Sequence, residues 1–195
     1  MADYQSNPLR TTAALVGLSS TLVLAGVNIG TSALFIPHLL SSSSSGSSSS
    51  SPLPIETTTA IFTRLYRDGA KLVVPLAAAG TLSFGLLAAE FSSFRGGPVA
   101  RGTLSSSLMD STPRILLATA SALVVSTLAW TGIVVMPVNN RLVSIAESSA
   151  KTDRGSSSKQ REEVDSLLRS WQWMNYVRGF GALAAGIVAL GALVV

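Results

Sequence analysis

The chain has 195 residues, of which 47% are hydrophobic and only 12% charged, and its mean hydropathy is +0.46. A soluble domain carries about 25% charged residues, so this composition is that of a membrane protein. The net charge is +4, but the basic residues lie beside apolar segments and form no patch with interleaved aromatic residues. We therefore expect no nucleic-acid partner. The absence of cysteine and the single histidine, His38, exclude disulfides, thiolate chemistry and a histidine-based metal cluster within one chain.

The first apolar segment covers residues 13–36, which is long enough to cross about 30 Å of hydrocarbon as a helix. It stops at Pro37 and His38. Residues 41–51 then follow, all serine except Gly46. Such a tract can bury nothing, so we predict a disordered loop.

The second helix is expected to begin near residues 57–59, whose threonines can cap it, and to cross the membrane over residues 72–89. Glu90 closes this span, and we interpret it as a structural residue that could pair with Arg95. Residues 90–114 are polar and contain Gly and Pro, which favours an irregular loop.

The third span covers residues 115–135 and ends at Pro137, and the fourth covers residues 179–195. The fourth helix is expected to start well before the bilayer, at the serine cluster of residues 156–158. The four spans leave no room for a separate globular domain. We therefore predict one domain, residues 1–195, with an all-α fold: an integral membrane protein built as a four-transmembrane-helix bundle.

Four spans place both termini on one side of the membrane, with the loops alternating between sides. The first and third loops and their helix ends carry ten Lys and Arg residues, and the other side carries four. The positive-inside rule then predicts that these two loops are cytoplasmic and that both termini are lumenal. We expect a multi-pass protein of the endoplasmic reticulum or another endomembrane.

Alternation also brings one end of every span to the same side of the membrane, and the unusual polar residues lie at these four ends. On the fourth helix, spacings of four and three residues place three of them on one face. They can line a cavity for an amphipathic aromatic substrate, or they can form an interfacial belt of aromatic and snorkelling residues without chemistry. The set comprises His38, Tyr66, Arg67, Asn139, Asn140, Arg141, Trp171, Asn175 and Arg178.

Four series of residues, some of them from this set, stand at the ends of the spans. They are Pro37 ending the first span; Tyr66, Gly69 and Pro75 entering the second; Pro137, Asn139 and Leu142 leaving the third; and Trp171, Asn175 and Arg178 entering the fourth. With them the sequence resembles the small membrane-bound anthrone oxygenases of fungal polyketide pathways. The resemblance covers nearly the whole chain outside the serine tract.

The resemblance implies a monooxygenase of polyketide secondary metabolism that oxidises the central methylene carbon of an anthrone, giving an anthraquinone and water. It implies dioxygen as co-substrate and no flavin, haem or metal. Removal of the methylene proton gives an electron-rich anthranolate that can react with dioxygen. Such an enzyme must supply a base, a stabiliser for the developing oxyanion and a dry pocket.

Within this scheme we assign the catalytic roles to polar residues at the four helix ends. Arg178 stabilises the oxyanion, with Asn175 and Asn139 as neutral donors. His38 and Tyr66 are the candidate bases, and His38 is the only side chain whose ordinary pKa suits proton transfer near neutrality. Relatives often carry histidine at the position of Asn175, so a histidine base at that position does not apply to this chain.

The substrate-binding residues are expected to be Tyr66 and Trp171, which stack on the tricyclic ring, together with Asn140 and Arg141. The expected partners are the lipid bilayer and a small aromatic polyketide, with a homo-oligomer or biosynthetic enzymes as protein partners. The alternative function is a non-enzymatic membrane scaffold or carrier that binds lipophilic polyketide intermediates. The polar residues at the four helix ends are the feature that discriminates between the enzyme and the scaffold or carrier.

Overall fold

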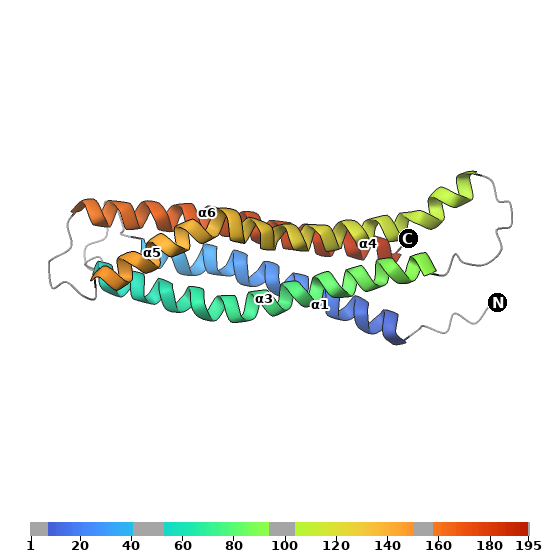
Figure 1. Ribbon diagram of the computed structural model, residues 1–195, viewed down its shortest axis with the longest axis horizontal. Coiled ribbons are helices and arrows are strands. Elements are labelled where there is room, and N and C mark those ends of the chain that lie inside the picture. The colour runs from blue at the N-terminus through green and yellow to red at the C-terminus, as the bar shows by residue number, and fades with distance from the viewer. Residues whose placement is uncertain (1–7, 41–52, 94–103, 150–157, 195) are drawn as a thin grey trace. The chain divides into compact units, whose positions relative to one another are not determined.

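A computed structural model describes residues 8–40, 53–93, 104–149 and 158–194. Within these ranges every regular element is a helix (Figure 1). Two short π-helices, η1 and η2, interrupt longer α-helices. The elements in chain order are α1 (Pro8–Gly30), η1 (Thr31–Phe35), α2 (Ile36–Leu39), α3 (Ile55–Ser93), α4 (Leu104–Trp130), η2 (Thr131–Val135), α5 (Met136–Ser149) and α6 (Ser158–Val194).

Among the described residues, four helical stretches are long and apolar enough to cross a membrane: Pro8–Leu39, Ile55–Glu90, Ser111–Ser149 and Ser158–Val194. This confirms the predicted all-α fold with four membrane-spanning helices. The start of α6 at Ser158 also agrees with the serine cluster expected to cap it. The serine loop predicted at 41–51 lies outside the described residues.

The helices around the second span are longer than predicted. Helix α3 begins at Ile55, before the threonines expected to cap it, and the hydroxyl of Thr59 donates to the Ile55 carbonyl over 2.8 Å. The loop expected at 90–114 is helical at both ends, since α3 continues to Ser93 and α4 starts at Leu104. A polar sequence can stay helical where its backbone groups bond internally, so hydropathy marks the membrane segment and not the helix end.

The helices also continue through Pro37 and Pro137, at which the first and third spans were predicted to end. A proline has no N–H, and its ring clashes with the carbonyl four residues earlier in a regular α-helix. In both places a π-helix lies just before the proline. The N–H of the residue that precedes the proline, Ile36 or Met136, bonds to the carbonyl of Thr31 or Thr131, five residues back. The wider π-turn makes room for the ring, so the chain remains helical.

The structure divides into two compact units. Unit 1 consists of Met1–Ala25, Val74–Leu128 and Phe180–Val195, and unit 2 consists of Gly26–Val73 and Ala129–Gly179. In each unit, segments of the four long helices pack as a bundle.

Unit 1 is held together by close approaches at small residues, as expected where helices pack in lipid without a hydrophobic driving force. A Cβ at Gly186 of α6 would lie 3.2 Å from the Thr21 hydroxyl of α1. The Ser121 hydroxyl of α4 donates to the Thr81 carbonyl of α3 over 3.1 Å.

One ion pair also crosses unit 1. Arg10 of α1 pairs with Glu90 of α3 over 2.9 Å. Glu90 is therefore paired within the described residues, whereas Arg95, its predicted partner, lies outside them.

The closest packing between helices in unit 1 is at Gly17 of α1. A Cβ there would lie 2.5 Å from Cε1 of the fully buried Phe84 and 3.1 Å from Cβ of Ser83. We expect Gly17→Ala to destabilise the protein by about 1–3 kcal/mol through overpacking. Thermal unfolding in detergent, followed by circular dichroism, measures the loss. Gly26→Ala in the same helix is the control, since nothing lies within 4 Å of its Cβ. Equal melting temperatures for the two variants would contradict the close packing at Gly17.

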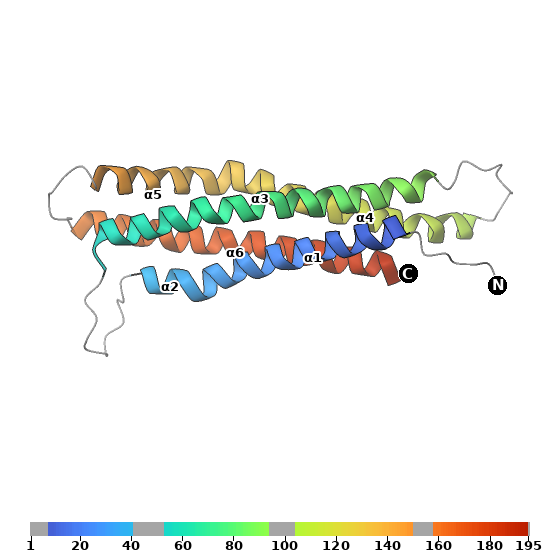
Figure 2. The same ribbon diagram turned by 90° about the horizontal axis from the view of Figure 1, so that it is seen from below.

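Unit 2 has an apolar core, to which α2, α3, η2, α5 and α6 all contribute. Helix α5 lies beside the first part of α3 in this unit (Figure 1, Figure 2). Phe62 is fully buried and meets the Trp171 ring edge-on, with ring centroids 5.3 Å apart. This core anchors the N-terminal half of α6, which carries the polar residues described next.

Candidate functional site

A buried polar network joins α6 to α1 and η1 within unit 2. The amide nitrogen of Asn175 donates two hydrogen bonds, to the Asn28 backbone carbonyl over 2.7 Å and to the Ser32 hydroxyl over 2.9 Å. Asn28 and Asn175 are each 1% exposed, and Ser32 is fully buried. Polar groups placed in a membrane helix must find such partners, because the hydrocarbon offers none.

Arg178 extends this network to η2. Its Nε donates to Oδ1 of Asn28 over 2.9 Å, and Nη1 donates to the Thr131 hydroxyl over 3.2 Å. Its Nη2 donates to Oδ1 of Asn175. These bonds use three of the five N–H groups of the guanidinium and leave two for a ligand.

The charge of Arg178 has no carboxylate partner among the described residues. Its three acceptors are neutral amide or hydroxyl oxygens, and the side chain is partly buried. A positive charge in a medium of low dielectric constant favours a nearby negative charge strongly. The arrangement therefore suits a ligand that is an anion or that develops negative charge on an oxygen.

The backbone explains how these residues meet. Asn175 and Arg178 are three residues apart on α6 and so share one face of the helix. Ser32 lies in η1 and Thr131 begins η2, so each π-helix contributes one hydroxyl to the network. π-Bulges inside α-helices occur frequently at functional sites.

Trp171 lies one turn before Asn175 and is 4% exposed. Its indole Nε1 is buried and has no hydrogen-bond partner among the described residues. Tyr66 of α3 is partly buried against the same apolar core, and its hydroxyl donates to the sulfur of Met136 over 3.3 Å. Tyr66 and Trp171, the two predicted stacking residues, thus belong to one core.

Asn139 of α5 is also buried, at 1% exposed, and its Oδ1 has no hydrogen-bond partner among the described residues. The indole Nε1 of Trp130, at the end of α4, is also buried and has no hydrogen-bond partner among the described residues. Buried polar atoms without partners are rare, and each calls for an explanation such as a ligand. Together with the buried Thr58 hydroxyl, which also has no partner among the described residues, unit 2 holds four such polar groups, and the Asn139 acceptor and the two indole donors could be satisfied by a polar ligand.

The other predicted site residues lie apart from this network. His38 is exposed on α2 and Asn140 is exposed on α5. Arg141 is exposed and pairs with Glu163 of α6 over 2.7 Å. Their roles in binding or catalysis stay predictions. In the part of the chain that the structure describes, no three His, Cys, Asp or Glu residues are grouped as a metal site would require.

Sequence reasoning missed four members of the network: Asn28, Ser32, Thr131 and Gln172, whose Nε2 donates to the Ser32 carbonyl over 2.7 Å. Asn28 carried a usable signal, because it is the only amide side chain in residues 13–36. A polar residue inside a membrane span is a candidate functional residue by default. The hydroxyl residues carried no signal, since Ser and Thr are common in packed membrane helices.

Comparison with known proteins gives one match. The family model described as anthrone oxygenase matches residues 62–188, which is more than half of the chain. No curated protein and no solved structure matches the chain. The matched range includes Tyr66, Asn139, Trp171, Asn175 and Arg178 and leaves out the first helix with Asn28.

Proposed function

The chain belongs to the anthrone oxygenase family, and on this premise we propose that it is a membrane enzyme that oxidises an anthrone to an anthraquinone with dioxygen. The observation that carries the proposal is the Arg178 guanidinium, which is partly buried, bonded to neutral oxygens and left with two N–H groups. Loss of a proton from the anthrone methylene places negative charge on the keto oxygen. Arg178 binds that oxygen more strongly as its charge grows, which is the condition for catalysis.

The reaction balances without further reagents. A base removes one methylene hydrogen as a proton, and the resulting anthranolate carbon passes one electron to dioxygen. The carbon radical and superoxide combine to form a C–O bond, and the peroxide oxygen takes up a proton. The hydroperoxide then loses water, which carries away the second methylene hydrogen, and a carbonyl group remains.

Asn175 acts on this chemistry through Arg178. Both hydrogens of its amide nitrogen are already donated, and its Oδ1 accepts from Nη2 of Arg178. It therefore has no donor left for the substrate oxygen, and we assign it as a positioning residue. Asn28 has the same role at Nε of the guanidinium.

The unpartnered polar atoms of unit 2 support an oxygen-bearing aromatic substrate. The Trp171 indole N–H can donate to a keto oxygen, and Oδ1 of Asn139 can accept from a phenolic hydroxyl. The Tyr66 ring, partly buried against the same core, supplies an aromatic face for a tricyclic system. A hydrocarbon of the same shape would leave the donor and the acceptor unpaired, at about 1–3 kcal/mol each.

The base is His38 or Tyr66, and single variants separate the two. Neutral imidazole suits proton transfer near neutrality. The Tyr66 hydroxyl, which donates to the sulfur of Met136, can act as a base only after it has lost its own proton. We expect kcat to fall about 100-fold in the variant that removes the base, either His38→Gln or Tyr66→Phe, and much less in the other. If neither variant lowers kcat, both assignments fail.

The activity itself is tested with membranes of a host that expresses the full chain. These membranes are supplied with an emodin-type anthrone under air, and anthraquinone formation is followed by absorbance against membranes without the protein. We expect formation well above the spontaneous rate, with oxygen consumed in equal amount. If the rates match while the anthrone still binds, the protein is a carrier or scaffold for lipophilic intermediates and the oxygenase proposal fails.

A further inference from the structure

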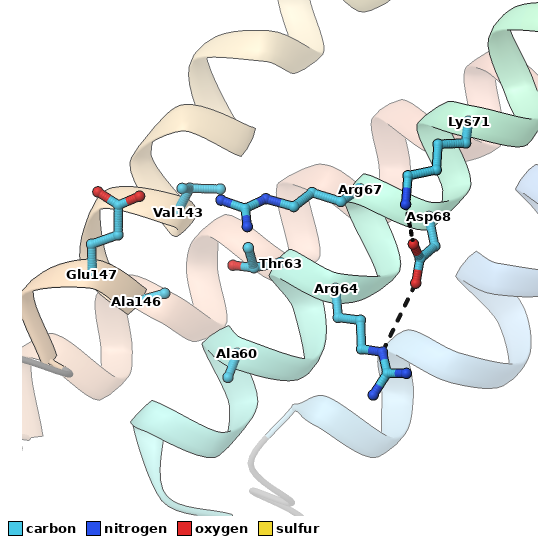
Figure 3. A pocket seen from close by; sticks show the side chains of 9 residues that line it. All are labelled: Ala60, Thr63, Arg64, Arg67, Asp68, Lys71, Val143, Ala146 and Glu147. Atoms are coloured by element: carbon cyan, nitrogen blue, oxygen red, sulfur yellow. Dashed lines mark hydrogen bonds and ion pairs between the residues drawn. The ribbon is translucent and has the colours of Figure 1, made fainter.

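A second polar feature of unit 2, outside the network, is a groove between α3 and α5 with a volume of about 560 Å³ (Figure 3). Small and apolar side chains lie between charged ones along it. We call it the α3–α5 groove. Its lining consists of Ala60, Thr63, Arg64, Arg67, Asp68 and Lys71 of α3 with Val143, Ala146 and Glu147 of α5.

The groove has a surplus of positive charge that is concentrated at Arg67. Asp68 is shared by its neighbours on α3, with Lys71 at 2.9 Å and Arg64 at 3.9 Å. The Arg67 side chain instead extends across the groove toward α5, near Val143, and has no hydrogen-bond or ion-pair partner among the described residues (Figure 3). Three cations against two carboxylates, Asp68 and Glu147, leave a net charge of +1.

The position of the groove along α3 indicates the membrane layer in which it lies. The run from residue 72 to residue 89 contains no charged side chain and is the apolar part of this helix. Arg67 precedes that run by five residues, which at 1.5 Å per residue is about 7.5 Å along the helix axis. The polar headgroup layer on each side of the hydrocarbon is about 5–8 Å thick. With residues 72–89 placed in the hydrocarbon, Arg67 lies at about the depth of lipid phosphates.

We propose that the α3–α5 groove binds the phosphate of an anionic phospholipid. The Arg67 guanidinium offers a planar pair of donors that matches two phosphate oxygens, and the ion pairs of Asp68 are exposed and weak enough for Lys71 and Arg64 to turn toward the ligand. The Thr63 hydroxyl already donates to the Thr59 carbonyl over 2.8 Å, so the cations carry the recognition. At this depth a phospholipid is held by its acyl chains beside the groove, an advantage that a soluble phosphate lacks.

The test uses the purified full chain in neutral detergent micelles, titrated with fluorescently labelled phosphatidic acid or phosphatidylcholine. We expect phosphatidic acid to bind about ten-fold more tightly, and Arg67→Gln to weaken its binding about five-fold, as loss of one exposed charged contact predicts. Asp68→Asn removes a competing carboxylate and should strengthen binding. Arg169→Gln removes an exposed cation of α6 outside the groove and should leave binding unchanged.

Each other outcome counts against the proposal. Equal weakening by Arg67→Gln and Arg169→Gln would indicate diffuse attraction to the whole charged surface. Competition by millimolar inorganic phosphate would indicate a site for a soluble anion. Equal affinity for the two lipids would show that the phosphate charge is not recognised. Anthrone oxidation plays no part in the assay, so its result is independent of the proposed catalytic function.

Discussion

Arg178→Gln is expected to lower kcat/KM for the anthrone about 100-fold or more, because removing one preorganised donor to an oxyanion typically costs that much. Glutamine keeps a polar amide that can still donate to Asn28 or Thr131, but it carries no charge to meet the developing anthranolate. The loss should appear mainly in kcat, since the neutral ground-state substrate gains little from the guanidinium. Single-turnover rates of anthraquinone formation in detergent measure it.

Arg178→Lys and Arg169→Gln complete this experiment. Lysine restores the charge but not the planar arrangement of donors that reaches Asn28, Thr131 and Asn175 together, so we expect an intermediate rate. Arg169 is exposed on the same helix, and its variant should match the wild type. A normal kcat in Arg178→Gln, with the protein folded, would remove Arg178 from the mechanism and with it the main support for the proposed chemistry.

Asn28→Asp is expected to lower kcat about 10-fold or more while keeping or raising the melting temperature. Aspartate has almost the same shape as asparagine, so its carboxylate would pair with Nε of Arg178 where Oδ1 of Asn28 now accepts over 2.9 Å. The ion pair stabilises the folded protein but neutralises the guanidinium before the substrate oxygen becomes negative. When both are measured on the same preparation, the melting temperature should therefore stay the same or rise while kcat falls.

Asn28→Ala serves as the comparison, because it removes the acceptor without adding charge. It leaves Nε of a partly buried guanidinium unpaired, which should destabilise the protein by about 1–3 kcal/mol and lower activity through loss of position. If Asn28→Asp retains full activity, the net positive charge of the network is not what the reaction uses. If both variants fall equally in stability and activity, Asn28 has only a structural role.

The fold was predictable from the sequence because a lipid environment allows the backbone few conformations. With no water to satisfy the backbone, an apolar run of the right length must be a helix, and four such runs give four crossing helices. The same hydropathy could not predict where each helix ends. Beyond the hydrocarbon, a segment such as residues 104–114 remains helical although most of its residues are polar.

Only the part of the candidate network on α6 could be predicted in the same way. The spacing of Trp171, Asn175 and Arg178 fixes their shared face on α6 from the sequence alone. Which residues of other helices meet that face depends on how the helices rotate about their axes, and no local pattern specifies this. Ser32 and Thr131 became members only through that packing.

The two π-helices also set the rotational register of the chain. Each π-turn accommodates one residue more than an α-turn, so the stripes before and after it are offset by about 100°, the angle between successive residues of an α-helix. Side chains on either side of η1 can therefore face different neighbours along one uninterrupted helix. The stripe before it can present Asn28 to α6, while the residues after it place Ile36 and Leu39 in the apolar core. Deleting one residue within Thr31–Phe35 would turn the π-helix into an α-helix and change the angle between Asn28 on one side and Ile36 and Leu39 on the other by about 100°.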